Sequence, residues 1–140
     1  MNPFQSLRDY ELLVYTLPQQ FPSIVGSTLV VAQRGRQVAE LIGELTFRDD
    51  YRLRIYERLF LPGSALSIEG YSYEAWRSTD KLYWYDSQPH PHDPTLASTH
   101  PHHKHVPPDI KAHRVPAPSL SFSAPNLPFL IQEIEGLLPS

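Results

Sequence analysis

The residues best suited to chemistry are seven histidines, which all lie between His90 and His113. Six of them form two groups, Gln88-Pro-His-Pro-His-Asp-Pro94 and His100-Pro-His-His-Lys-His105. Histidine gives and takes protons near neutral pH and is the commonest metal ligand. The segment therefore offers acid–base chemistry or metal binding.

Three interpretations of this segment are open. In the first, two imidazoles act as general base and general acid, and a lysine stabilises the charge that develops on a phosphate. These are the groups that cleave RNA without a metal, when the 2′-hydroxyl attacks the adjacent phosphate. In the second, the segment holds a divalent metal, although neither group has the spacing of a zinc-binding helix. In the third, it is a surface loop of low complexity.

The residues that belong to these interpretations are few. The candidate catalytic residues are His90, His102, His103, Lys104, His105 and Glu57. The ligands of the alternative metal site are His92, His102, His105 and Asp86.

Glu57 interrupts an apolar strand face formed by Leu53, Ile55 and Leu59. A carboxylate on such a face must find a partner or take up a proton. It either lies near a sheet end or pairs with a basic side chain, or it points into a pocket and orients a histidine of the loop.

The opposite face of the same strand carries three arginines. Arginine interleaved with aromatic residues binds single-stranded RNA through phosphate contacts and base stacking. The solvated outer face of a sheet has the same composition, and tyrosines nearby are often plain cross-strand pairs. The candidate RNA-binding residues are Arg52, Arg54, Arg58, Tyr73 and Tyr85.

The elements that must position these side chains follow from periodicity and turn residues. Asn2 and Pro3 predict the start of a helix that ends at Pro18 and Pro22. In the strand expected at 66–77, Tyr71 and Tyr73 share a side with Ser67 and Glu69. Short turns between successive strands predict an antiparallel meander. The predicted strands cover residues 28–32, 38–47, 51–61, 66–77 and 82–86.

The pattern changes after Asp86. Residues 87 to 128 hold ten of the 15 prolines, which cannot donate to a β-ladder. We expect an irregular His/Pro-rich loop over 87–126 that folds back over an end or face of the sheet, followed by a helix that starts at Asn126 or Leu127. The predicted fold is one α+β domain over 1–140: a curved antiparallel sheet of about five strands with N- and C-terminal helices.

Composition limits the class of protein. The chain has 140 residues, of which 41% are hydrophobic and 19% charged, so it can form a packed core. A net charge of −3 argues against general adhesion to nucleic acid but allows a local basic face. The absence of cysteine excludes disulfides and thiolate metal sites. We find no signal peptide and no membrane-spanning run, and expect a cytoplasmic protein with no cofactor and no membrane partner.

Three strings together resemble one protein family. Tyr83-Trp-Tyr-Asp86, followed by Pro89-His-Pro-His92 and His100-Pro-His-His-Lys-His105, is similar to the hallmark of the TumE-type toxins. The first histidine group departs from the family's Pro-His-His, and His100 stands where that family has an aromatic residue. The resemblance implies a small bacterial toxin encoded beside a helix-turn-helix antitoxin, with strands first, then the histidine loop and a C-terminal helix.

The leading hypothesis is a toxin that acts as a metal-independent endoribonuclease on single-stranded RNA. His102 and His105 would share acid–base work with His90, Lys104 would stabilise charge, and Glu57 would orient. RNA and a cognate antitoxin are the expected partners, and a homodimer is left open. The alternative is a non-catalytic regulatory or interaction protein whose histidine loop is a binding surface or a divalent-metal site.

Overall fold

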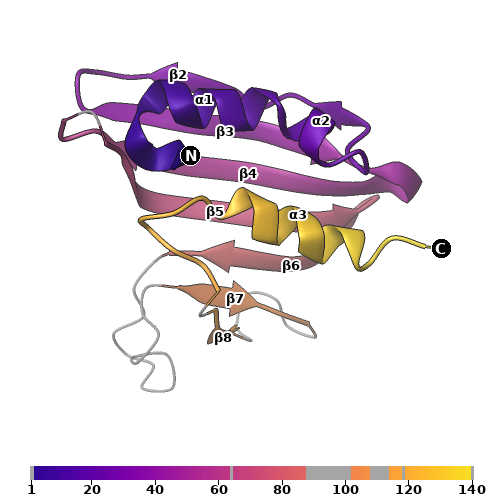
Figure 1. Cartoon of the computed structure of the whole chain (residues 1–140). Coiled ribbons are helices and arrows are strands. Elements are labelled where there is room, and N and C mark those ends of the chain that lie inside the picture. The colour runs from indigo at the N-terminus through magenta and orange to yellow at the C-terminus, as the bar shows by residue number, and fades with distance from the viewer. Residues whose placement is uncertain (1, 64, 88–101, 108–113, 118, 140) are drawn as a thin grey trace.

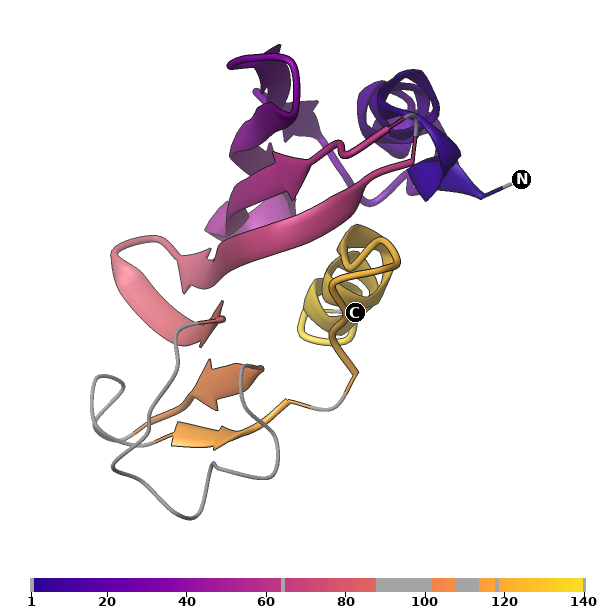
Figure 2. The same ribbon diagram turned by 90° about the vertical axis from the view of Figure 1, so that its left-hand side faces the viewer.

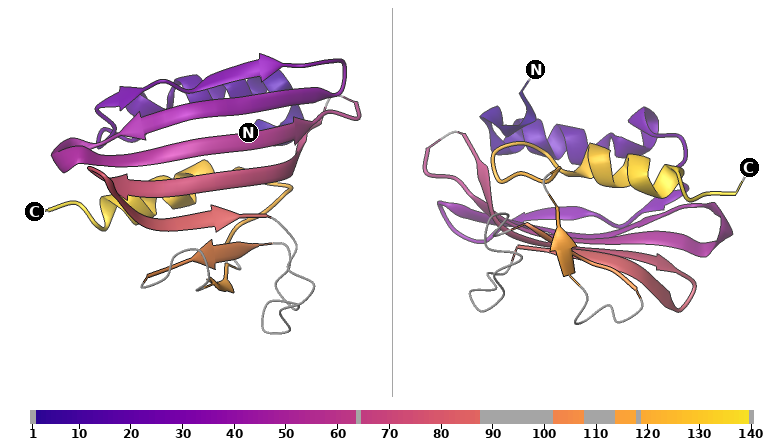
Figure 3. Two further views of the ribbon diagram at one scale, coloured as in Figure 1. Left: turned by 180° about the vertical axis from the view of Figure 1, so that it is seen from behind. Right: turned by 90° about the horizontal axis from the view of Figure 1, so that it is seen from below.

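The structure is a computed structural model that describes residues 2–63, 65–87, 102–107, 114–117 and 119–139. The predicted site residues His90 and His92 lie outside this part of the chain. An antiparallel sheet carries the helices α1, α2 and α3 on one of its faces, and no described helix covers the other (Figures 1 and 3). The predicted α+β class is therefore observed.

The elements follow one another in a simple order. The helices are η1 (Pro3–Gln5), α1 (Leu7–Tyr15), α2 (Leu17–Gln20), η2 (Arg48–Asp50) and α3 (Leu127–Glu135). The strands are β1 (Gly26–Ser27), β2 (Val30–Gln33), β3 (Val38–Thr46), β4 (Tyr51–Phe60), β5 (Ser67–Arg77), β6 (Asp80–Asp86), β7 (His103–His105) and β8 (Arg114–Pro116).

The sheet has more strands than the sequence predicts. Its described part runs in the order β1-β3-β4-β5-β6-β7-β8, and β2 also pairs with β3. Strands β2 to β6 correspond to the five predicted ones, and the prediction of about five was too low because β1, β7 and β8 are only two or three residues long. Such short strands carry too little alternation to be recognised.

Two of these short strands lie in the segment predicted to be irregular. Its high proline content hides the proline-free run from His102 to Val106, in which the backbone donors needed for a ladder are present. Strand β7 uses them to pair with β6, and β8 then pairs with β7. The prediction of a wholly irregular segment over 87–126 was therefore wrong for these residues.

The N-terminal helix is also divided. Asn2 accepts a hydrogen bond from the backbone of Phe4 at the start of η1, and Ser6 accepts one from Asp9 at the start of α1. Pro18 was predicted to end the helix but lies in the first turn of α2. Proline fits there because the first backbone N–H groups of a helix have no intrahelical acceptor.

The hydrophobic core fills the space between the helices and the sheet, which Figure 2 shows edge-on. Tyr10 and Val14 of α1 and Ile131 of α3 are almost completely buried. They pack in the same cluster as Leu53 and Ile55 of β4. Alternate residues of β4 are buried over its whole length, as its sequence predicts.

A β-bulge corrects the predicted face of β5. Arg58 is opposite Gly70, but the next residue, Leu59, is opposite Ile68, so β5 has one extra residue, Glu69. A bulge exchanges the two faces of a strand for all residues beyond it. Tyr71 and Tyr73 therefore point to the helix face and are buried, away from the side predicted for them.

Glu57 is a fully buried carboxylate in the middle of this core. The hydroxyls of Tyr10 and Tyr73 each donate a hydrogen bond of 2.5 Å to it. The side-chain amide of Asn126 donates to the Tyr73 hydroxyl at 3.0 Å. Burial raises the pKa of Glu57 to about 7, although the two tyrosine hydrogen bonds act in the opposite direction. The cluster joins α1, β4, β5 and the residue before α3.

Glu57 should make the free energy of unfolding depend on pH. Its pKa rises on folding, so the folded state holds a proton that the unfolded state has lost, and stability falls as pH rises from about 4.5 to about 7. Relative to Glu57→Gln, the wild type should lose about 3 kcal/mol over this range and nothing more above it. Urea unfolding across pH 4.5–8 measures this, with Glu69→Gln, an exposed carboxylate, as control. If the free energies of unfolding of the wild type and of Glu57→Gln changed with pH in parallel, the raised pKa of Glu57 would be contradicted.

Gly43 of β3 should tolerate no side chain. Its φ is +148°, and an added Cβ would lie 2.6 Å from the Thr28 carbonyl oxygen and 2.8 Å from Leu29 Cα. We expect Gly43→Ala to lower the free energy of unfolding by about 2 kcal/mol, because both the backbone conformation and the contact are unfavourable. Gly35→Ala is the control, since a Cβ added there would meet no atom within 4 Å beyond its two chain neighbours. Equal urea midpoints for the two variants would disprove the expectation.

Candidate functional site

Strand β7 distributes the histidine group over both faces of the sheet. It pairs with β6 so that His105 is opposite Trp84, Lys104 opposite Tyr85, and His103 opposite Asp86. Successive side chains of a strand point to opposite faces. His103 and His105 therefore share the face that the helices leave open, and Lys104 points to the helix face.

A histidine–carboxylate pair lies on the open face. His105 Nε2 is 3.1 Å from Asp86 Oδ2, and both side chains are nearly fully buried. The His105 ring stacks on Trp84 with 4.2 Å between ring centroids and 17° between the planes. When Nε2–H donates to the carboxylate, the basic lone pair of the neutral imidazole is on Nδ1. The second imidazole of this face, His103, is completely buried.

Lys104 is held by the C-terminal helix. Its Nζ lies 3.2 Å from Glu133 Oε2 of α3, and the Tyr85 hydroxyl donates to the same carboxylate at 2.9 Å. The ammonium also lies 4.4 Å from the ring centroid of Tyr83. An ammonium above an aromatic ring and beside a carboxylate is well compensated. The charge of Lys104 is thus used to hold α3 on the sheet.

His102 lies on the helix face. Its Nδ1 is 2.5 Å from the Tyr71 hydroxyl, and the two rings are nearly parallel with 5.7 Å between centroids. The Phe122 ring also packs against the His102 ring, with 4.6 Å between the ring centroids. The pKa of Tyr71 is raised, first by burial and then by the charge of Asp86. A phenol with a raised pKa keeps its proton, so it can donate to Nδ1.

The predicted catalytic set is therefore divided. His102 and His105 were expected to work together, but strand alternation places them on opposite faces, and it separates Lys104 from His105 in the same way. Glu57 was expected to orient a histidine, but its oxygens accept hydrogen bonds from Tyr10 and Tyr73. The carboxylate that meets a histidine among the described residues is Asp86.

The alternative metal site is only partly assembled. Asp86 and His105 are adjacent, whereas His102 is on the other face and His92 is outside the described residues. Within the part of the chain that the structure describes, no group of three or more His, Asp or Glu residues is arranged to hold a metal ion.

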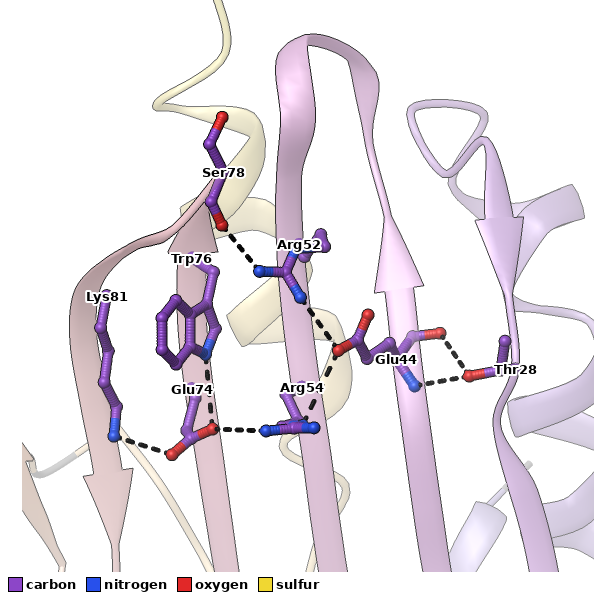
Figure 4. Close-up of polar contacts among 8 residues, drawn as sticks. All are labelled: Thr28, Glu44, Arg52, Arg54, Glu74, Trp76, Ser78 and Lys81. Atoms are coloured by element: carbon purple, nitrogen blue, oxygen red, sulfur yellow. Dashed lines mark hydrogen bonds and ion pairs between the residues drawn. The ribbon is translucent and has the colours of Figure 1, made fainter.

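The predicted arginine face is observed, with its charges paired. Arg52 lies 3.1 Å from Glu44, and Arg58 lies 3.0 Å from Glu69. Arg54 lies between two carboxylates, 3.7 Å from that of Glu44 and 3.8 Å from that of Glu74 (Figure 4). Ion pairs this exposed contribute little to stability.

Tyr73 and Tyr85 do not share this face. Both are buried on the helix face, so the predicted stacking platform of tyrosines beside the arginines was wrong. The aromatic residues of the open face include Tyr56, Trp76 and Trp84. Lys81 Nζ lies 5.8 Å from the ring centroid of Trp76 and 4.3 Å from that of Trp84. Alternation in 82–86 places Trp84 on the face opposite to Tyr83 and Tyr85, but the burial of the tyrosines is what assigns Trp84 to the open face.

None of the helices in the described ranges has the length and apolar character that crossing a membrane requires.

Comparisons with known proteins identify one family. A search against curated proteins and another against solved structures gave no match. The family model described as Toxin TumE matches residues 14–138, which include every described strand, α3 and both histidine groups. The chain therefore belongs to the TumE family of toxins.

Proposed function

We propose that this toxin is an endoribonuclease that cleaves single-stranded RNA without a metal, with His105 and Asp86 at the centre of its site. The observation that carries the proposal is the 3.1 Å contact between His105 Nε2 and Asp86 Oδ2, on a face that also holds a second histidine. Membership of the family supports a toxin role and a cognate antitoxin. That RNA is the target is our inference from the groups present.

The two imidazoles of the open face belong to residues two apart on one strand. Residues two apart on a strand lie about 7 Å from each other, so His103 and His105 can stand on either side of one phosphate. His105 Nδ1 would take the proton of the 2′-hydroxyl as its oxygen attacks phosphorus. His103 would give a proton to the departing 5′-oxygen, leaving a 2′,3′-cyclic phosphate and a free 5′-hydroxyl.

Asp86 would act through His105. A carboxylate that accepts from Nε2–H fixes which nitrogen is basic and stabilises the imidazolium that forms once the proton has been taken. His103 and His105 are 0% and 1% exposed, so RNA cannot reach them in this conformation. The proposal therefore requires a conformational step before cleavage.

Removal of either partner of the His105–Asp86 pair should lower the rate of RNA cleavage without loss of the fold. We expect His105→Gln to reduce RNA cleavage about 100-fold or more, and Asp86→Asn at least about tenfold, with chelator present throughout. Asp80→Asn is the matched control, because it makes the same change at the exposed end of the same strand. Cleavage of a mixed RNA pool with detection of the cyclic phosphate is the measurement, and circular dichroism confirms that each variant is folded.

Two outcomes would contradict the nuclease proposal. One is intact RNA after incubation with the folded wild-type protein. The other is cleavage that Asp86→Asn and His105→Gln leave unchanged. Intact RNA together with zinc retained through purification would instead favour the non-catalytic, metal-binding alternative.

A further inference from the structure

We propose that the open face of the sheet is the track along which the RNA strand reaches the site, and that Arg54 binds a phosphate about four nucleotides from the bond that is cleaved. This inference rests on the proposed function and adds to it a path and a minimum length for the substrate. It concerns the face shown without helices in Figure 3.

One cross-strand row joins Arg54 to His105. Successive strands place Arg54 opposite Glu74, Glu74 opposite Trp84, and Trp84 opposite His105. Directly opposed residues of neighbouring strands have their side chains on the same face. The row therefore crosses β4, β5, β6 and β7 as a straight line on the open face, and it ends at the proposed catalytic imidazole.

Arg54 is the cation of this face that is best placed to receive a phosphate. Its side chain is 63% exposed, and its contacts with Glu44 and Glu74 are 3.7 and 3.8 Å, longer than hydrogen bonds. By contrast, Arg52 donates to Glu44 and to the Ser78 carbonyl oxygen, and Lys81 lies 2.8 Å from Glu74 (Figure 4). Arg54 can therefore turn towards a ligand without breaking a hydrogen bond to another described residue.

The length of the row sets the minimum length of RNA that can contact both Arg54 and His105. Three strand spacings separate Arg54 from His105, or about 14 Å. Stacked nucleotides rise about 3.4 Å each, so about four of them cover this span. A phosphate contact of this kind positions the strand but does not read its bases, so it favours long over short RNA without regard to sequence.

Binding of an oligonucleotide that cannot be cleaved tests the track directly. The probes are 2′-O-methyl oligouridines of eight and two nucleotides, which lack the attacking hydroxyl. We expect Arg54→Ala to weaken binding of the octanucleotide at least about threefold and to lower the salt dependence by about one phosphate contact. Binding of the dinucleotide, followed by NMR shifts, should not change because it cannot span the row.

Two further variants address the alternatives, the first a general charge effect and the second a damaged fold. Arg34→Ala removes an ion-paired arginine of similar exposure, 56% against 63%, that lies outside the row, and should leave the binding of both probes unaffected. Glu44→Gln removes the carboxylate shared by Arg52 and Arg54, and should tighten binding of the octanucleotide. A gain of affinity cannot come from a damaged fold.

The inference fails if Arg54→Ala binds the octanucleotide as the wild type does, or if Arg34→Ala weakens it equally. It also fails if the wild type cleaves RNA and Arg54→Ala has the same KM for long RNA. That result would leave the nuclease proposal supported. Octanucleotide binding that needs Arg54, in a protein that leaves RNA intact, supports the track and refutes the nuclease. The two proposals are thus tested apart.

Discussion

The pairing of β6 with β7 is the constraint on which the candidate site depends. Three registered residue pairs bring a histidine-rich tripeptide against the end of a tyrosine-rich strand, and place a carboxylate opposite an imidazole. Without this ladder Asp86 and His105 would be nineteen residues apart in the chain with nothing to join them. The same ladder then sorts the tripeptide between two faces, because side chains alternate along a strand.

The two faces have different physical roles. On the helix face, Lys104 and Tyr85 bind Glu133 of α3, while Glu57 is enclosed by tyrosines from α1 and β5. These polar groups are satisfied by neighbours in the core, and they hold the helices in position on the sheet. On the open face, the arginines and Lys81 are at least partly exposed to water, where a ligand can exchange with their carboxylate partners. The Asp86–His105 pair of the same face is buried.

Charge on the open face is nearly balanced, which matches a chain with a net charge of −3. Arg52 and Arg54 share Glu44, and Lys81 lies beside Glu74 and over Trp84 (Figure 4). A phosphate that binds here must replace a carboxylate, so affinity comes from an exchange of partners and not from an excess of cations. Binding of this kind is moderate in strength and sensitive to salt.

The sequence by itself determined the α+β class, the five longer strands, the closing helix and the inward position of Glu57, because each follows from periodicity within one segment. It also placed Arg52, Arg54 and Arg58 on one face, and it carried the TumE resemblance. Only the tertiary structure decided the rest. The bulge at Glu69 turned Tyr71 and Tyr73 inward, the short strand β7 separated His102 from His105, and Asp86 took the position expected of Glu57. These features depend on pairing between strands, and a pattern read along a single strand contains no information about the register of its neighbour.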